Sequence, residues 1–309
     1  VDYDKKIARL ITLAVAGGLL LTIALCIVAF RAYRKSKLFS TQLGEQNDII
    51  IRKNADITDS IQYSRRIQEA LLPEANQVKK ILGDAFVFYK PKDIISGDFY
   101  WIQERGDKVF FMAADCTGHG VPGALMSMIG STLLNECVVE KHIEQPGAIL
   151  DDVRTGIIRS LKQQDESGVQ DKTKDGMDGA LCMFDRTSRQ LYFSGAYNPL
   201  WIIRAGEILE FKADKFPIGI SGAELRSFTT HKVETKSGDM VYIFTDGYAD
   251  QFGGEHGKKL KYSGLRELLI SCSKMSADEQ HTKLENHFAA WRGSLEQVDD
   301  ACIIGVRID

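Results

Sequence analysis

The sequence predicts an α+β domain that follows a membrane-spanning helix and a linker helix. Three observations lead to this prediction: an uncharged N-terminal stretch, a seven-residue repeat after it, and short apolar runs separated by tight turns from Asp84 onward. Strands that follow one another through tight turns form antiparallel meanders, and helices gather in the middle and at the end. A parallel βαβ fold is therefore disfavoured. We divide the chain into residues 1–37, 38–73 and 74–309.

Residues 10–30, LITLAVAGGLLLTIALCIVAF, form the first element and carry no charge. A helix needs about 20 residues to span a bilayer, which this run supplies. A signal peptide is the alternative, but its apolar region is usually only about 7–15 residues long. The basic flank RAYRKSK favours a cytoplasmic C-terminal side, although Lys5, Lys6 and Arg9 lie on the other flank. We expect this segment to pass once through the inner (plasma) membrane, with the catalytic domain in the cytoplasm.

Residues 38–73 form the second element, a helix with a weak apolar seam. Leu43, Ile50, Ile57 and Leu71 lie at a seven-residue spacing, with Ser64 as the one gap, and Asn47, Asn54, Ile61 and Gln68 lie at the partner positions. Asn at core positions specifies the register of a coiled coil at a cost in stability. We predict a parallel homodimer through residues 43–72; the alternative is a surface helix that packs on the following domain. Pro73 ends the helix.

Residues 74–309 combine strands and helices. Apolar runs indicate nine strands: AFVFYK, FYWIQ, KVFFMAA, ALCMFD, QLYFSGA, LWIIR, RSFTTHKV, MVYIFT and ACIIGVRI. The turns ERGD and RAGE join neighbouring runs. Helical patterns cover four stretches: about 122–141, 146–163, 264–274 and 277–292. The domain therefore has a layered α+β architecture.

Charge and cysteine usage exclude several classes of function. The chain has 39 Lys and Arg against 42 Asp and Glu, a formal net charge of −3. A general nucleic-acid binder would carry a basic excess, so we expect no nucleic-acid partner. The six cysteines contain no C-x-x-C pair and indicate neither a zinc site nor a disulfide framework. A cysteine phosphatase requires an Arg six residues after its catalytic Cys, and no cysteine of this chain has one. The sequence therefore excludes that class.

Aspartates lie at the ends of the predicted strands. Asp98 precedes FYWIQ and Asp115 follows KVFFMAA, and the two ends of a hairpin lie side by side. Asp246 ends MVYIFT, whereas Asp299 and Asp300 precede ACIIGVRI, so antiparallel pairing would bring these acids to one sheet edge. Crowded carboxylates raise one another's pKa, and an all-oxygen site favours Mg²⁺ or Mn²⁺ over zinc. The alternative is that each Asp only forms a turn.

The stretch AADCTGHGVPGALMSMIG, residues 113–130, places a glycine-rich loop between an acid and a helix. Glycines allow the backbone to approach a bound group, and the start of a helix offers unpaired N–H groups to an anion. His119 is a candidate general acid; the alternative is a loop histidine bonded to backbone. Asp175 and Asp178 could help to hold a third ion, but turn residues are the favoured interpretation.

Six segments carry a resemblance to a known family. They occur in this order: SGDFYW, AADCTGHGVPGALMSMIG, DGMDGALCMFD, GAYNPLWIIR, FTDGYADQFGG and DDACIIGVRI. Together they closely resemble the stage II sporulation E type of bacterial protein phosphatase, in the metal-dependent PPM superfamily. The resemblance covers residues 56–309, including the helical lead-in DITDSIQYSRRIQEALLP. It implies an αββα sandwich, two antiparallel sheets between helical layers, and dephosphorylation of phosphoserine or phosphothreonine on a protein.

The resemblance also implies a set of site residues. Asp115 would bridge two ions of Mn²⁺ or Mg²⁺, and the backbone carbonyl of Cys116 would help to hold one of them. Asp246 and Asp299 would be further ligands. Asp98 would complete the metal-binding acidic cluster through water. The candidate catalytic residues are therefore Asp98, Asp115 and His119.

The same resemblance suggests the partner. The substrate would be a small phosphorylated regulatory protein such as an anti-sigma-factor antagonist. A non-catalytic membrane signalling scaffold of the same fold is the alternative function. A membrane histidine kinase would share the layout of a membrane helix and a coiled coil, but strands that end in aspartate do not fit that class.

Overall fold

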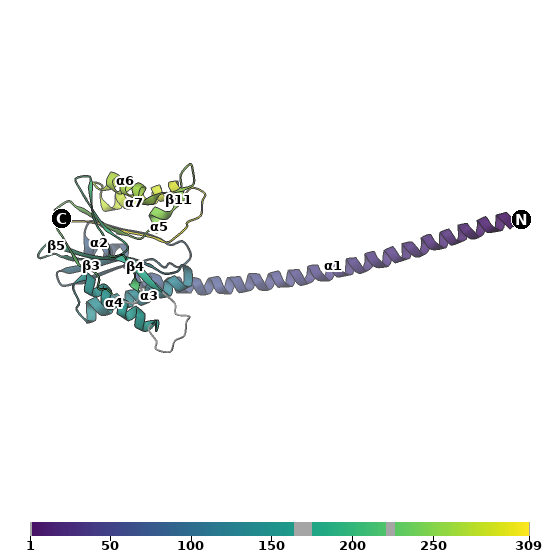
Figure 1. The fold of residues 1–309 in the computed structure, drawn as a ribbon, viewed down its shortest axis with the longest axis horizontal. Coiled ribbons are helices and arrows are strands. Elements are labelled where there is room, and N and C mark those ends of the chain that lie inside the picture. The colour runs from purple at the N-terminus through teal and green to yellow at the C-terminus, as the bar shows by residue number, and fades with distance from the viewer. Residues whose placement is uncertain (1, 164–174, 221–225, 309) are drawn as a thin grey trace. The chain divides into compact units, whose positions relative to one another are not determined.

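The computed structural model describes residues 2–163, 175–220 and 226–308. The chain divides into two compact units, Val1–Ser60 and Ile61–Asp309. One helix, α1 (Asp2–Leu71), runs through the first unit and into the second (Figure 1). It ends two residues before Pro73, as predicted. Its apolar N-terminal part is long and apolar enough to cross a membrane by length and composition. The coiled coil stays a prediction.

Sheet A contains five antiparallel strands in the spatial order β1-β13-β10-β6-β7. Their bounds are Ala85–Lys90 (β1), Ala301–Arg307 (β13), Met240–Phe244 (β10), Leu200–Arg204 (β6) and Glu207–Phe211 (β7). Sequence neighbours β6 and β7 form a hairpin through the predicted RAGE turn. The central strands β13 and β10 come from the C-terminal third of the chain. Strand β1 therefore joins the sheet only through long-range pairing with β13.

Sheet B follows the order β2-β3-β4-β5-β9, and β8 also pairs with β4. Its strands are Phe99–Arg105 (β2), Lys108–Cys116 (β3), Gly176–Asp185 (β4), Gln190–Ala196 (β5), Ile218–Gly219 (β8) and His231–Val233 (β9). The first four are antiparallel neighbours in sequence order. The described residues add a small ribbon, Phe252–Gly253 (β11) with Lys258–Lys259 (β12).

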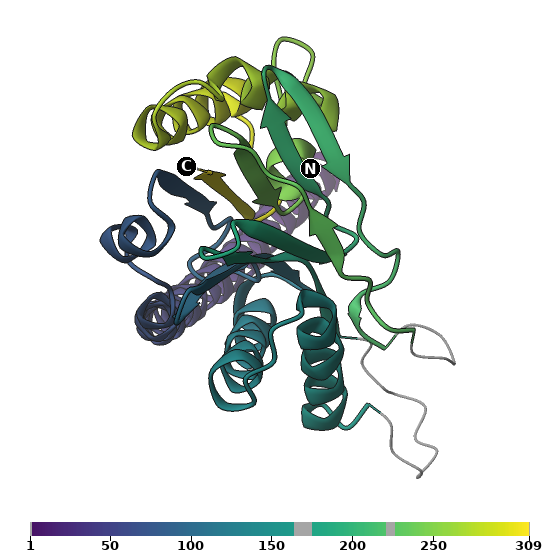
Figure 2. The ribbon, with the colours of Figure 1, turned by 90° about the vertical axis from the view of Figure 1, so that its left-hand side faces the viewer.

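The two sheets lie between two layers of helices (Figure 2). One layer consists of α3 (Gly120–Asn135) and α4 (Pro146–Ser160) on sheet B; the other consists of α6 (Lys261–Cys272) and α7 (Ala277–Arg292) on sheet A. Shorter helices are α2 (Ala75–Leu82) beside β1, the π-helix Glu136–Glu140 after α3, and α5 (Gly247–Asp250). This arrangement confirms the expected αββα sandwich.

Strand β3 shows why its sequence is apolar almost without interruption. Alternate side chains of a strand point to opposite faces. Phe110 and Met112 join the apolar cluster with α3 and α4, whereas Phe111 and Ala113 join the cluster between the two sheets. All four side chains are buried. A strand covered on both faces therefore needs apolar residues at every position rather than at every second one.

The described strands agree with the apolar runs except in two cases. Strand β4 begins at Gly176, four residues before the run ALCMFD. The run RSFTTHKV was expected to be a strand from 226 to 233, but only His231–Val233 pairs in sheet B. Side chains satisfy the earlier backbone instead: the Phe228 N–H donates to Asp151 and the Thr229 N–H donates to Asp214. Because carboxylates accept these N–H groups, their hydrogen bonds are satisfied without a neighbouring strand. The elements α2, α5, β7, β8 and the β11–β12 ribbon were not predicted.

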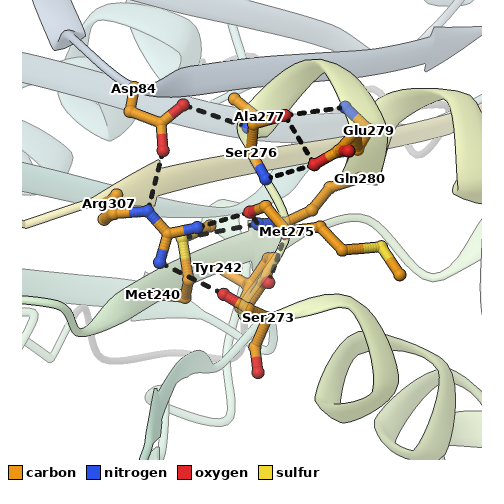
Figure 3. A network of polar contacts seen from close by, with 10 residues as sticks. All are labelled: Asp84, Met240, Tyr242, Ser273, Met275, Ser276, Ala277, Glu279, Gln280 and Arg307. Atoms are coloured by element: carbon orange, nitrogen blue, oxygen red, sulfur yellow. Dashed lines mark hydrogen bonds and ion pairs between the residues drawn. The ribbon is translucent and has the colours of Figure 1, made fainter.

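Arg307 ties the end of β13 to two other segments (Figure 3). Its Nε donates to Asp84 Oδ2 over 2.7 Å, and its other nitrogens donate to the carbonyls of Ser273 and Met275. Asp84 also accepts the N–H of Ala277, the first residue of α7, over 3.0 Å. One ion pair thus joins the residue before β1, the end of β13 and the connection between α6 and α7.

Candidate active site

The strand register brings the predicted acids to one end of the sandwich. In sheet B, Phe99 pairs with Ala114, so Asp98 and Asp115 lie at the open end of the β2–β3 hairpin. Asp178 lies directly opposite Asp115 on β4. In sheet A, Phe244 pairs with Ile303, which places Asp246 beside the residues that precede β13. Local hairpin pairing and long-range pairing thus meet at the same edge.

A cavity of about 240 Å³ opens at this edge. Its lining is rich in carboxylates and glycine-loop backbone: Asp115, Cys116, Thr117, Gly118, His119, Asp178, Asp299 and Asp300. Asp98 and Asp246 lie outside this lining but interact with it through charge. Asp115, Asp300 and Asp299 raise the pKa of Asp98, and Asp246 raises the pKa of both Asp115 and Asp178. The cavity therefore has the oxygen donors that a hard cation requires.

Asp115 and Asp98 are the most strongly perturbed acids of the cluster. Burial raises the pKa of Asp115 to about 8, with further increases from Asp246, Asp299 and Asp178, against a lowering hydrogen bond with Asp98. Burial and the charge of Asp115 also hold the pKa of Asp98 well above its usual range, although Thr245 Oγ1 donates to Asp98 Oδ2 over 2.5 Å. A nearby divalent cation would favour the charged forms and relieve this repulsion.

Asp178 corrects the sequence interpretation. It was expected to be a turn residue, but it is the third residue of β4, and it faces the same cavity as Asp115. Burial followed by the charge of Asp246 raises the pKa of Asp178 to about 6. Asp175 lies before the strand, and its backbone carbonyl accepts a hydrogen bond from Gln163.

The neighbours Asp299 and Asp300 have different surroundings. Asp300 is 3% exposed, and each of its carboxylate oxygens accepts one backbone N–H over 2.7 Å, from Lys92 and from Gly97. Asp299 is half-buried, and burial raises its pKa. Asp300 thus fastens the loop that leads to Asp98. Asp299 Oδ1 accepts the N–H of Asp300 over 2.9 Å, and its Oδ2 accepts no hydrogen bond from the described residues.

Two glycines allow the loops around the acids to pack closely. A Cβ on Gly97 would lie 2.6 Å from the Gly118 carbonyl oxygen, and a Cβ on Gly123 would lie 2.1 Å from the same atom. Gly118 itself has φ +88°, a conformation that side chains rarely adopt. We expected these glycines to let the backbone approach a bound group. In the structure, the absence of a Cβ lets the loop after Asp115 contact the loop before Asp98.

His119 bonds to a side chain rather than to backbone. Its Nδ1 lies 3.1 Å from Asp93 Oδ2, and the ring lines the cavity with 64% of its side chain exposed. Among the residues that the structure describes, no backbone group bonds to the ring, in contrast to the alternative of a loop histidine bonded to backbone. The Asp93 carboxylate orients the ring beside the acids.

Gln68 near the end of α1 reaches the same loops, a role that the sequence analysis missed. Its Nε2 donates to the Ser96 carbonyl over 2.7 Å and to Ser127 Oγ over 2.9 Å, and its Oε1 accepts the Ser96 N–H. Gln68 is 5% exposed, and its hydrogen-bond partners belong to its own chain. Its heptad position indicated that the side chain would be buried, but not which residues it would contact.

The donor set fits divalent ions that keep part of their water. Among the residues that the structure describes, no three His, Cys, Asp or Glu side chains are placed to hold one ion together. Mg²⁺ is usually bound through one or two carboxylates and retains several waters. Asp115, Asp299 and the backbone at Cys116 line the cavity, and the donors that they offer are oxygen atoms, which hard cations prefer.

Comparisons with known proteins agree with this geometry. The family profile of stage II sporulation protein E (SpoIIE) matches residues 105–309. The SiaA-PP2C domain of Pseudomonas aeruginosa is 32% identical with a TM-score of 0.74, and the match covers 83% of this chain and 98% of that one. A comparison with curated proteins gives no match.

Two more distant structures show the fold alone. The PP2C phosphatase domain with a regulatory fragment of SpoIIE from Bacillus subtilis is 20% identical with a TM-score of 0.56, covering 72% of this chain and 62% of that one. The RsbU and RsbW domains of a Mycobacterium tuberculosis protein are 19% identical with a TM-score of 0.55, covering 72% and 59%.

The sandwich and its acid-lined edge define a PP2C-type (PPM) serine/threonine protein phosphatase, a class whose members depend on divalent metals. Within that class, the chain belongs to the stage II sporulation protein E family.

Proposed function

We propose that this phosphatase is anchored in the membrane, uses two ions of Mn²⁺ or Mg²⁺, and acts on a small phosphorylated regulatory protein. The observation that carries the proposal is the set of buried carboxylates around Asp115, whose mutual repulsion is only partly offset by Lys92, which acts on Asp299, and by Lys259, which acts on Asp246. The alternative is a non-catalytic signalling scaffold of the same fold.

The positions of the acids support a ligand set. Asp115 would bridge two ions, the Cys116 carbonyl would help to hold one of them, and Asp246 and Asp299 would be further ligands. When bound, the ions supply a water nucleophile of lowered pKa and stabilise charge on the phosphoryl oxygens. Asp98 is buried, the hydroxyl of Thr245 orients its carboxylate, and it would act on the ions through water. A third ion would use Asp178.

His119 is the proposed general acid for the departing serine or threonine oxygen. It is exposed at the cavity, and Asp93 holds its Nδ1, which leaves Nε2 for proton transfer. Replacement of His119 by Gln should lower kcat by about 10²–10³-fold, within the range of general acid catalysis. The loss should be smaller for an aryl phosphate, whose leaving group needs no proton. An equal loss for both substrates would contradict the assignment.

Substrate choice is proposed to depend on docking of a folded protein. Between Asp84 and Gly130 the only arginine is Arg105, in the β2–β3 hairpin turn at the opposite end of these strands from Asp115. Without an arginine clamp, a free phosphate monoester has few charge-assisted contacts to the enzyme. Small aryl phosphates should therefore be poor substrates compared with phosphoproteins.

The helix α1 is the proposed route of regulation. Residues 10–30 would anchor the chain, residues 43–72 would pair in a parallel dimer, and Gln68 connects the same continuous helix to the loops beside Asp98 and Asp115. A shift of the helix would therefore be transmitted to those loops, given two arrangements of similar energy. Truncation before Thr41 and before Glu74 should give different oligomeric mass and turnover; equal values would remove the linker from the mechanism.

The decisive experiment measures phosphate release from candidate phosphoproteins. We expect a chelator to abolish release and Mn²⁺ or Mg²⁺ to restore it. Asp115→Asn should lower turnover by orders of magnitude while the domain stays folded, because the substitution relieves like-charge repulsion. Asp107→Asn, an exposed acid in the β2–β3 turn, is the matched control and should retain full activity. Turnover in excess chelator would refute the metal mechanism; a chain that binds metal without releasing phosphate from any candidate would favour the scaffold.

A further inference from the structure

A second cavity of about 280 Å³ lies at the end of the sandwich opposite the acids. Val109, Phe111 and Phe184 line it from sheet B, and Val306 and Ile308 line it from the chain end of sheet A. Val109 is six residues from Asp115 along β3, a distance of about 20 Å at the rise of a strand. The cavity, here called the distal cavity, is therefore separate from the phosphatase site.

The interior of the distal cavity is apolar. Val109, Phe111 and Val306 are at most 4% exposed to solvent, and the end of α2 closes one side with Ile81. Its volume is near the lower end of the roughly 300–1,000 Å³ typical of small-molecule sites. A ligand that fills it would need a compact apolar body.

Four cations and no carboxylate side chain belong to the described lining: Lys80, Arg186, Arg189 and Arg307. Two of them are already neutralised, since Arg186 pairs with Glu104 and Arg307 pairs with Asp84. Lys80 and Arg189 are exposed, and their side chains have no hydrogen bond or ion pair with the part of the chain that the structure describes. The apolar cavity thus has an excess of two positive charges at its edge.

We propose that the distal cavity binds a small amphipathic carboxylate. Its apolar body lies against Phe111, Phe184 and Val306, and its carboxylate is held by Lys80 and Arg189. A guanidinium matches a carboxylate with two parallel hydrogen bonds, and burial of the apolar body removes water from a preformed hollow. Both β3 and β13 run from this cavity to the acid cluster, so an occupied site lies on the same strands as Asp115 and Asp299.

The test uses 2-naphthoate as the probe and the full chain in phosphatidylcholine nanodiscs, with empty nanodiscs as the background for equilibrium dialysis. We expect saturable binding at one site. The Lys80→Gln, Arg189→Gln double variant should weaken it at least tenfold. The neutral analogue 2-naphthalenemethanol should bind at least tenfold more weakly than naphthoate to the unaltered chain.

A matched control removes one Lys and one Arg elsewhere on the surface. Arg159→Gln with Lys232→Gln, both exposed and outside the cavity, should bind naphthoate like the unaltered chain. Asp115→Asn should also bind naphthoate like the unaltered chain. Failure of the proposed phosphatase mechanism can therefore be distinguished from failure of this proposal. The proposal is overturned if binding does not exceed the nanodisc background, if the double variant binds as the control does, or if the neutral analogue binds equally well.

Discussion

Replacement of Gln68 by Met tests whether hydrogen bonds from α1 stabilise the loop before Asp98. Met has nearly the same shape, so the change opens no large cavity, but it removes three hydrogen bonds. Ser96 is fully buried, so its N–H and its carbonyl would both lose their partner. Ser127 Oγ keeps its bond to the Ala124 carbonyl. Each unsatisfied buried group costs about 1–3 kcal/mol, so the two groups of Ser96 should together lower the free energy of unfolding by about 2–6 kcal/mol.

Tryptophan fluorescence during urea unfolding measures this change. All three tryptophans, Trp101, Trp201 and Trp291, lie in residues 74–309, so the signal reports on the catalytic domain and not on the apolar helix. Gln62→Met, at an exposed position of the same helix, should stay within about 0.5 kcal/mol of the unaltered chain. Turnover should fall in Gln68→Met as well, because Ser96 is two residues from Asp98. Equal stability of the two variants would refute the reasoning.

Three further predictions concern the loops and the acid stability. Asp300→Asn leaves only one acceptor for the two backbone N–H groups of Lys92 and Gly97, so unfolding measurements should show a loss of about 1–3 kcal/mol, and an unchanged stability would refute that role. Gly123→Ala places a Cβ 2.1 Å from the Gly118 oxygen; overpacking should cost about 1–3 kcal/mol, whereas a stabilised protein would show that the loop can move. Burial raises the pKa of Asp84, but hydrogen bonds from Arg307 and Ala277 bring it below 3.8 overall (Figure 3). This carboxylate therefore stabilises the fold above its unfolded pKa and loses that contribution as the pH falls through its lower folded value. Asp84→Asn should accordingly reduce the dependence of unfolding free energy on pH below about 4, and an unaltered pH profile would contradict the pairing.

The sequence alone determined the elements whose cause is local. Apolar runs bounded by turn residues located β1, β2, β3, β5, β6, β10 and β13, because a strand between two covered layers is apolar at nearly every position. The β2–β3 hairpin placed Asp98 beside Asp115 before any long-range contact was known, since a hairpin register follows from its turn. The motifs around those acids were sufficient to recognise the family.

Only the tertiary structure decided which groups complete the site. The partners of Gln68, Asp98 and Asp300 lie far away along the chain: Ser96 is 28 residues from Gln68, Thr245 is 147 residues from Asp98, and Gly97 is 203 residues from Asp300. No local pattern distinguishes a carboxylate that binds backbone from its neighbour that faces a cavity. The physical reason is that a polar group becomes buried and partnered only when distant strands pair, so its role is set by contacts that the sequence order does not contain.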